Sequence, residues 1–374
     1  MRGQSKRIIK EVSARAQRLD RYDVGETIEG LASKIGRKPS DILKLNSNEN
    51  FFIPLDFLRS ILREVVEEVD PRIYPRDEFR RLKETLSGCY DISPNNIVIS
   101  TGSDQLIELV SRMLLKEGDD ALSITPTFAI YERCVKIQGA VYKRIPLKRD
   151  FSLDTEALLS SATPKTKVIF LCSPNNPTAN QFRREDILRL AEEFDGVVAV
   201  DEAYADFAAE TLIDSARELE NLIVFRTFSK VFGLAGLRVG YTVTNRRLAK
   251  TINERFQMPY PVSIVALKAA TKILGKMDYI RKLIIEVKAE RSRLINELNR
   301  MEGVKAFPSE TNFVLFQVNR DSSVVYESLL SRGIIVRNIG CVLGFKNCLR
   351  VTVAPAQMME RFIEELGRVL SDHE

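Results

Sequence analysis

Residues 197–204, Val-Val-Ala-Val-Asp-Glu-Ala-Tyr, and residues 222–230, Leu-Ile-Val-Phe-Arg-Thr-Phe-Ser-Lys, decide the fold. Each stretch begins with four apolar residues and ends in polar ones. Apolar runs without alternation are typical of parallel strands that are buried on both faces. The two stretches therefore predict neighbouring strands at the centre of an α/β domain with a mostly parallel sheet.

Similar apolar runs occur outward from this centre and alternate with helical patterns. We expect further strands at 96–99, 121–124, 167–172 and 238–243. Helical patterns begin at Gln105, Phe128 and Arg184. Strands that alternate with helices predict crossover connections. The sequence thus predicts a large α/β domain over residues 50–258.

The pattern changes after Pro259-Tyr260-Pro261, which interrupts it. A long helical stretch over 278–301 follows, with strand-like runs at 312–318, 334–336 and 349–353 and a closing helix from Ala356. These elements predict a smaller α+β domain over residues 259–374. Residues 1–49 are expected to join this smaller domain, and an apolar stripe over residues 5–19 predicts an amphipathic arm that packs on another element.

Composition narrows the class of protein. The chain has 374 residues, of which 44% are hydrophobic and 29% are charged, and its net charge is +5. No apolar run approaches the roughly 18–20 residues that a transmembrane helix needs, and the basic N-terminus lacks the apolar core of a secretion signal. We therefore expect a cytoplasmic protein with no membrane partner. The only histidine is His373, so histidine-based triads and metal sites are excluded, and five scattered cysteines predict reduced thiols without a metal.

Polar residues follow several of the predicted strands, and ligands of open α/β sheets bind at such strand ends. Each group has an ordinary structural explanation alone, such as capping of the next helix. Together they supply what pyridoxal 5'-phosphate requires: an amine for a Schiff base, a carboxylate for the pyridine nitrogen, a donor to the ring 3-oxygen and a phosphate cup. The candidate for the amine is Lys230, and the candidate for the carboxylate is Asp201. Tyr204 or Asn176 would donate to the 3-oxygen. The candidates for the phosphate cup are Gly102, Ser103, Thr227, Ser229 and Arg238.

Residues 226–241, Arg-Thr-Phe-Ser-Lys-Val-Phe-Gly-Leu-Ala-Gly-Leu-Arg-Val-Gly-Tyr, resemble the lysine motif of the histidinol-phosphate aminotransferase family, within the fold-type-I pyridoxal-phosphate enzymes. The resemblance spans nearly the whole chain, with further matching strings in the family's order. These strings lie at 44–50, 74–75, 102–104, 126–128, 174–178, 201–204, 311–316, 333–337 and 349–352. This resemblance implies an aminotransferase with a large and a small domain.

The resemblance implies a role for each matching residue. Lys230 would hold the cofactor and move a proton, Asp201 would pair with the ring nitrogen, and Phe128 would stack on the ring. The 3-oxygen would be bound by Tyr204 and Asn176, and the phosphate by Ser103, Asp104, Ser229 and Arg238, with Gly102 and Thr227 in the same cup. Tyr74 would reach the phosphate of the neighbouring subunit, which implies a homodimer. The substrate would be bound by Tyr22, Asn48, Arg337 and Arg350.

Two arginines suit both glutamate and a phosphorylated amino donor, because guanidinium groups match carboxylate and phosphate alike. The expected reaction is amino transfer from histidinol phosphate to 2-oxoglutarate, a step of histidine biosynthesis. Some positions depart from the family pattern, namely Arg76, Gln105, Ser173, Ala179 and the segment around Tyr22. Aromatic amino-acid transamination and threonine-phosphate decarboxylation therefore stay open as alternatives. A competing hypothesis from a different functional class is a non-catalytic protein whose basic arm binds nucleic acid. Because charges of both signs alternate along the helical stretches, we expect no nucleic-acid partner.

Overall fold

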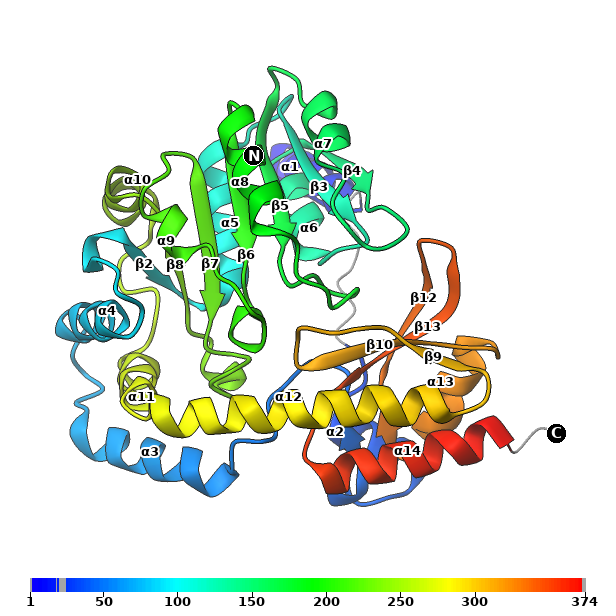
Figure 1. The fold of residues 1–374 in the computed structure, drawn as a ribbon. Coiled ribbons are helices and arrows are strands. Elements are labelled where there is room, and N and C mark those ends of the chain that lie inside the picture. Colours follow the sequence, from blue (N-terminus) through cyan, green and yellow to red (C-terminus); the bar gives the residue numbers. More distant parts are fainter. Residues whose placement is uncertain (1, 18, 20–24, 372–374) are drawn as a thin grey trace.

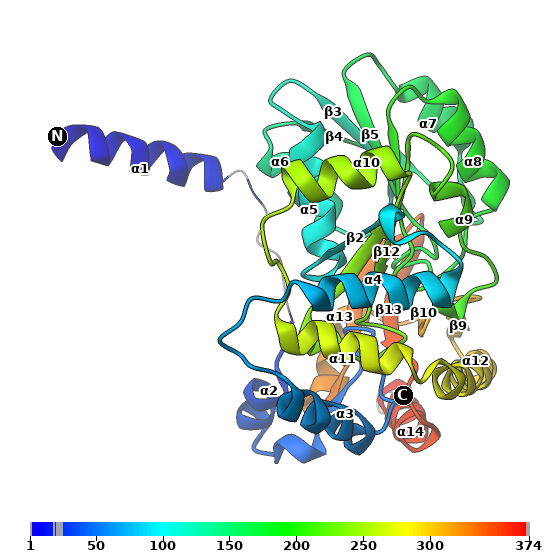
Figure 2. The same ribbon diagram turned by 90° about the vertical axis from the view of Figure 1, so that its left-hand side faces the viewer.

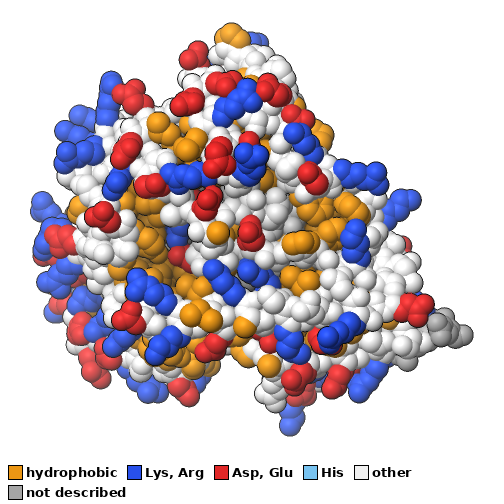
Figure 3. Space-filling model, viewed as in Figure 1, with side chains coloured by type: hydrophobic (Ala, Val, Ile, Leu, Met, Phe, Trp, Pro, Cys, Tyr) orange, Lys and Arg blue, Asp and Glu red, His pale blue; other side chains and the backbone are white. Residues whose placement is uncertain are grey.

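The computed structural model describes residues 2–17, 19 and 25–371. Two residues singled out in the sequence, Tyr22 and His373, lie outside these residues. No helix in the described part of the chain is long and apolar enough to cross a membrane. On the face shown in Figure 3, basic and acidic side chains are interspersed, as the alternating charges of the sequence predict.

Within the described residues, the larger sheet has seven strands in the order β2-β8-β7-β6-β5-β3-β4. The bounds of these strands, in the same order, are Ile97–Ser100, Gly240–Val243, Leu222–Thr227, Val197–Asp201, Thr166–Cys172, Asp120–Thr125 and Val141–Pro146. The strands from β7 to β4 pair in parallel, which confirms the predicted mostly parallel sheet. Strand β8 is antiparallel to both of its neighbours. The chain therefore turns back between β7 and β8, and this turn carries Lys230.

Helices cover both faces of this sheet (Figure 1). On one face α5 (Gly102–Leu114), α6 (Ile130–Ile137) and α10 (Arg246–Thr251) pack against side chains such as Ala199. On the other face lie α7 (Thr155–Ser161), α8 (Arg184–Glu193) and α9 (Ile213–Ala216), which pack with Val198 and Val200. Successive residues of β6 point to opposite faces, and both faces are apolar because both are covered.

The C-terminal part contains an antiparallel sheet in the order β12-β13-β10-β9. These strands are Arg337–Val342, Phe345–Thr352, Phe313–Val318 and Val304–Ala306. The associated helices are α12 (Met277–Arg300), α13 (Ser322–Ser331) and α14 (Ala356–Ser371). Strand β1 (Leu43–Lys44) pairs in parallel with β11 (Ile334–Ile335), so the segment after the arm lies against this part. The domain limits at residues 49/50 and 258/259 stay a prediction.

Four further α-helices are α2 (Ile28–Ile35), α3 (Leu55–Glu68), α4 (Asp77–Tyr90) and α11 (Ile264–Leu274). Helix α1 (Arg2–Ala16) projects away from the rest of the molecule (Figure 2). Its apolar side chains Ile8, Ile9 and Val12 are exposed. The predicted helical arm is therefore present, but within one chain these side chains do not pack on another element.

Candidate active site

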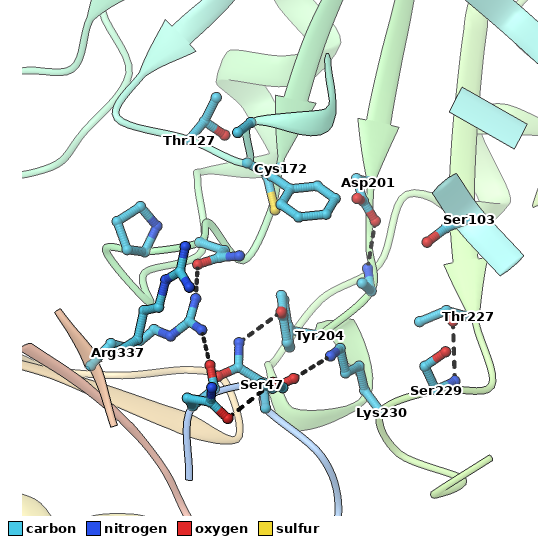
Figure 4. A pocket seen from close by; sticks show the side chains of 18 of the residues that line it. Ser47, Ser103, Thr127, Cys172, Asp201, Tyr204, Thr227, Ser229, Lys230 and Arg337 are labelled. Carbon is cyan, nitrogen blue, oxygen red and sulfur yellow. Dashed lines mark hydrogen bonds between the residues drawn. The ribbon is translucent and has the colours of Figure 1, made fainter. Parts of the chain in front are cut away.

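A cavity of about 640 Å³ lies at the carboxyl ends of the central strands. Its walls also include the start of α5, residues 46–49 and the β12–β13 hairpin. Figure 4 shows side chains from these elements pointing into one space. Of the site residues predicted from the sequence, thirteen line this cavity: Asn48, Ser103, Asp104, Phe128, Asn176, Asp201, Tyr204, Thr227, Ser229, Lys230, Arg238, Arg337 and Arg350.

Asp201 is the last residue of β6, and its carboxylate is buried. The backbone N–H of Ala203 donates to Oδ1 at 3.1 Å, and the hydroxyl of Tyr131 donates to Oδ2 at 3.0 Å. Burial raises the pKa of Asp201 to about 7, and the hydrogen bond from Tyr131 opposes this rise. Such a carboxylate gains a partner when a positively charged ring nitrogen binds beside it, which is what pyridoxal phosphate offers.

Lys230 lies in the turn that leaves β7 and lines the cavity. Its Nζ donates a hydrogen bond to the backbone carbonyl of Ser47 at 2.9 Å. Burial and then the nearby Arg350 lower the pKa of Lys230 to about 8. A substantial fraction of the amine is therefore neutral near pH 7–8, and the neutral amine is the nucleophilic form.

The start of α5 and the turn before β8 form a cup of donors. Gly102 begins α5 with a φ of 79°, and a Cβ there would lie 2.7 Å from Nη2 of Arg238. A Cβ at Gly240 would lie 2.6 Å from the backbone nitrogen of Ser103. Both positions thus need glycine for this close approach. Arg238 donates to Ser229 Oγ at 3.3 Å and to Asp104 Oδ2 at 2.8 Å.

Backbone N–H groups at a helix start, hydroxyl groups and a guanidinium group are the donors that bind a phosphate. The cup lies on the same cavity as Asp201 and Lys230. The residues present therefore fit the phosphate, the ring nitrogen and the aldehyde carbon of pyridoxal phosphate together. Gly102 lies next to the guanidinium group of Arg238 and does not itself line the cavity.

Two asparagines, one tyrosine and one arginine that line the cavity form hydrogen bonds with one another or with the nearby backbone. Asn48 Nδ2 donates to the hydroxyl of Tyr204 at 2.9 Å. Arg350 donates to the side-chain carbonyl of Asn176 and to the backbone carbonyl of Asn46. Because the carbonyl of Asn176 accepts from Arg350, the amide nitrogen is the atom that can donate to a ligand. The hydrogen bond from Asn48 likewise fixes the position of the Tyr204 hydroxyl.

Arg337 and Arg350 are directly opposite each other on the paired strands β12 and β13. Both line the cavity. Like charges that face each other across a strand pair repel, so this arrangement is stabilised when an anion binds. The guanidinium of Arg350 also lies 5.2 Å from the ring centroid of Phe313, which limits its movement. The sequence predicted each arginine singly, and their direct pairing comes from the strand register.

Tyr74, a further predicted site residue, is not brought into this cavity within one chain. Tyr22 lies outside the described residues. The side chain of Tyr74 is 74% exposed and its ring stacks on Tyr260, with centroids 4.8 Å apart. Within one chain Tyr74 therefore does not line the cavity, and a contact with the cofactor needs a second subunit.

Comparisons with known proteins agree with this site. The model of the family "Aminotransferase class I and II" matches residues 40–366. The histidinol-phosphate aminotransferase of Thermoanaerobacter sp. (strain X514) is 38% identical over 329 residues, covering 87% of this chain and 93% of that protein. The chain belongs to the histidinol-phosphate aminotransferase family.

Further members of this family extend the match. The protein of Methanosarcina mazei is 38% identical over 352 residues, covering 92% of this chain and 93% of that protein. The crystal structure of the Sinorhizobium meliloti enzyme, solved in complex with pyridoxal-5'-phosphate, has a TM-score of 0.85 at 26% identity and covers 94% of this chain and 96% of that one. The predicted fold type I, aminotransferase class and pyridoxal-phosphate cofactor are confirmed.

Some residues of this family member's cavity were not predicted. Tyr131, in the first turn of α6, contacts Asp201 and lies three residues after Phe128, which precedes the helix. Ser47 accepts from Lys230 through its backbone carbonyl, so its side-chain type carries no signal. Cys172 lies beside Asp201 because the two are opposite each other on β5 and β6.

Proposed function

We propose that this aminotransferase transfers the amino group of histidinol phosphate to 2-oxoglutarate, giving imidazole acetol phosphate and glutamate. The observation that carries the proposal is the pairing of Arg337 with Arg350 on the cavity wall. Two neighbouring guanidinium groups suit a site that binds a phosphate in one half-reaction and two carboxylates in the other. The relatives from Thermoanaerobacter sp. and Methanosarcina mazei are named for the same donor, which supports the proposal.

The cavity residues would divide the work as follows. Pyridoxal phosphate supplies an electron sink for the bond that breaks at the substrate Cα. Lys230 holds the cofactor and then carries a proton from Cα, a transfer for which an amine with a pKa of about 8 is suited. Asp201 keeps the ring nitrogen positively charged, while Asn176 and Tyr204 donate to the 3-oxygen. Phe128 lies against the ring.

Two further groups would bind anions. Ser103, Asp104, Ser229 and Arg238, with Gly102 and Thr227, hold the phosphate of the cofactor. Arg350, assisted by Arg337, Asn48 and Tyr22, binds the acidic group next to the reacting carbon. The binding of Arg350 to Asn176 links the substrate anion to the 3-oxygen contact, because one guanidinium touches both.

The donor is tested by steady-state kinetics. We expect kcat/KM for histidinol phosphate to exceed the value for phenylalanine by about a hundredfold or more, because a phosphate offers the two guanidinium groups more oxygen acceptors and more negative charge than a single carboxylate does. Threonine phosphate should release no carbon dioxide above background. A higher kcat/KM for phenylalanine, or steady decarboxylation of threonine phosphate, would replace this assignment with the corresponding alternative.

The protein is further proposed to act as a cytoplasmic homodimer. Exposed apolar side chains lie near Tyr74, namely Ile73, Met258 and Tyr260. An apolar surface of this kind is typical of a subunit interface. The described cysteines, Cys89, Cys134, Cys172, Cys341 and Cys348, are all free thiols, which fits a reducing compartment.

Mixing two variants of low activity tests whether Tyr74 acts across the interface. Tyr74→Ala should lower activity about tenfold or more, because it removes a donor to the phosphate. Mixed dimers of Tyr74→Ala with Lys230→Ala contain one complete site and one doubly altered site. Unfolding and refolding an equal mixture should therefore recover about a quarter of the native activity. No recovery, when sedimentation shows that mixed dimers have formed, would place Tyr74 on its own subunit's site or on none.

A further inference from the structure

Tyr131 has a buried hydroxyl group that faces the proposed ring-nitrogen partner. It lies on α6, its side chain is fully buried, and its hydroxyl donates to Asp201 Oδ2 at 3.0 Å. The other oxygen of Asp201 accepts from the backbone of Ala203. Both carboxylate oxygens are thus fixed from the protein side, which leaves their remaining lone pairs directed at the cavity.

The ring of Tyr131 is held by two other aromatic side chains. It stacks on Phe170 with centroids 5.4 Å apart and an interplanar angle of 1°. It meets Phe128 edge to face, with centroids 5.8 Å apart and an angle of 86°. Phe128 lines the cavity, so Tyr131 contacts both side chains proposed to bind the cofactor ring. These two contacts hold the phenol oxygen beside Asp201.

We propose that Tyr131 is a positioning residue that orients the Asp201 carboxylate and keeps it ionised toward the pyridine nitrogen of the cofactor. A tyrosine packed only for its apolar surface would be replaced by phenylalanine without loss. The hydroxyl instead donates to a carboxylate at 3.0 Å, with the thiol of Cys172 as its other polar neighbour, and that carboxylate is the group on which the electron sink depends. The inference rests on the cofactor of the family and not on which amino donor is used.

The electrostatic surroundings of Asp201 give the hydroxyl this influence. Burial raises the pKa of Asp201 to about 7, and the bond from Tyr131 is the largest effect that lowers it. Burial and then Asp201 raise the pKa of Tyr131 well above its usual value, so the phenol stays protonated and donates. The other titratable groups facing this pair are Asp104 from α5, Cys172 from β5, Tyr204 and Lys230.

The experiment compares Tyr131→Phe with Tyr142→Phe in the full chain. Tyr131→Phe keeps both aromatic contacts and removes only the donor. Tyr142 on β4 packs against the same apolar cluster and is not a partner of Asp201, so it controls for loss of a phenol in this region. Two quantities are measured without any amino donor: the dissociation constant of pyridoxal phosphate and the pH midpoint of its visible absorption band on the protein.

Tyr131→Phe is expected to weaken cofactor binding about ten- to a hundredfold, which is the range for a hydrogen bond to a charged group. The pH midpoint should rise by roughly half a unit or more, because a less positive ring nitrogen withdraws less charge from the bound amine of Lys230. With saturating cofactor, kcat should fall while KM changes little. Tyr142→Phe should change none of these. Unchanged binding and an unchanged midpoint in Tyr131→Phe would overturn the proposal.

A double-mutant cycle with Asp201→Asn separates this role from general packing. If Tyr131 acts through the carboxylate, Tyr131→Phe should have almost no further effect on cofactor affinity once Asp201 is asparagine. Losses that add in full would overturn the proposal. Thermal unfolding of the cofactor-free proteins accompanies the cycle. Because cofactor affinity, the absorption midpoint and thermal unfolding are all measured without an amino donor, a failure in these measurements is distinct from a wrong choice of histidinol phosphate.

Discussion

Lys230→Ala is expected to lower kcat by about four orders of magnitude, because it removes both the covalent attachment of the cofactor and a positioned proton carrier. The cofactor should still bind, since Asp201 and the cup around Arg238 remain. Its visible spectrum should become that of the free aldehyde, without the pH-sensitive band of the native protein. Stopped-flow and steady-state kinetics measure the loss of turnover, and absorption spectra measure the loss of the band.

The matched control is Lys250→Ala, an exposed lysine of α10 that lies outside the cavity. It should leave the spectrum and kcat unchanged. A small primary amine in solution should restore part of the activity of Lys230→Ala, since it can accept the Cα proton from the space that the side chain leaves. If Lys230→Ala retained more than about a hundredth of native turnover, Lys230 would not be the proton carrier.

The sequence predicted the strand-end residues well for a physical reason. Parallel strands bring their carboxyl ends to one edge of the sheet, so polar residues after separate strands meet there whatever lies between them. Asp201 ends β6 and Asn176 follows β5 in this way. Lys230, which follows β7, was identified by the same reasoning and lies in the same cavity. The departure at Ala179 can also be located: its φ is 67°, a conformation that favours glycine.

Other parts of the site depend on information that one local pattern does not carry. Tyr131 is a buried aromatic in a helix, and only the packing of α6 on the sheet shows that its hydroxyl meets Asp201. The antiparallel direction of β8 was missed because an apolar run does not reveal strand direction. Tyr74 illustrates a third limit, since the contact with a second subunit that is proposed for it cannot be seen within one chain.

The second large effect is expected at Arg226, four residues before Lys230 on β7. Its side chain is only 4% exposed, and it pairs with Glu202 at 3.0 Å and with Asp206 at 2.6 Å. Its guanidinium lies 5.4 Å from the ring centroid of Tyr90. Glu202 also accepts from the backbone of Leu212 at 2.6 Å. This network joins the turn after β6, which carries Tyr204, to the strand that leads to Lys230.

Arg226→Met is expected to lower the free energy of unfolding by about 3–5 kcal/mol, because it removes the cation and leaves the buried Glu202 and the partly buried Asp206 without their partner. Burial already raises the pKa of Glu202 above its usual value. Without Arg226 this rise should increase, so the folded variant binds a proton more readily than the unfolded chain. The deficit relative to the native protein should therefore shrink as the pH falls from about 7 to about 5. Urea unfolding of the cofactor-free proteins at both pH values measures this change.

Arg189→Met provides the comparison, because Arg189 also binds two carboxylates, Glu156 and Glu193, but does so on the surface. Exposed ion pairs are weakened by solvent, so this variant should unfold at nearly the native urea concentration. If Arg226→Met lost less than about 1 kcal/mol, the buried charges would have found water or another donor. The network would then not hold the turn after β6 against β7, and the positions of Tyr204 and Lys230 would depend on the apolar packing of the two strands instead.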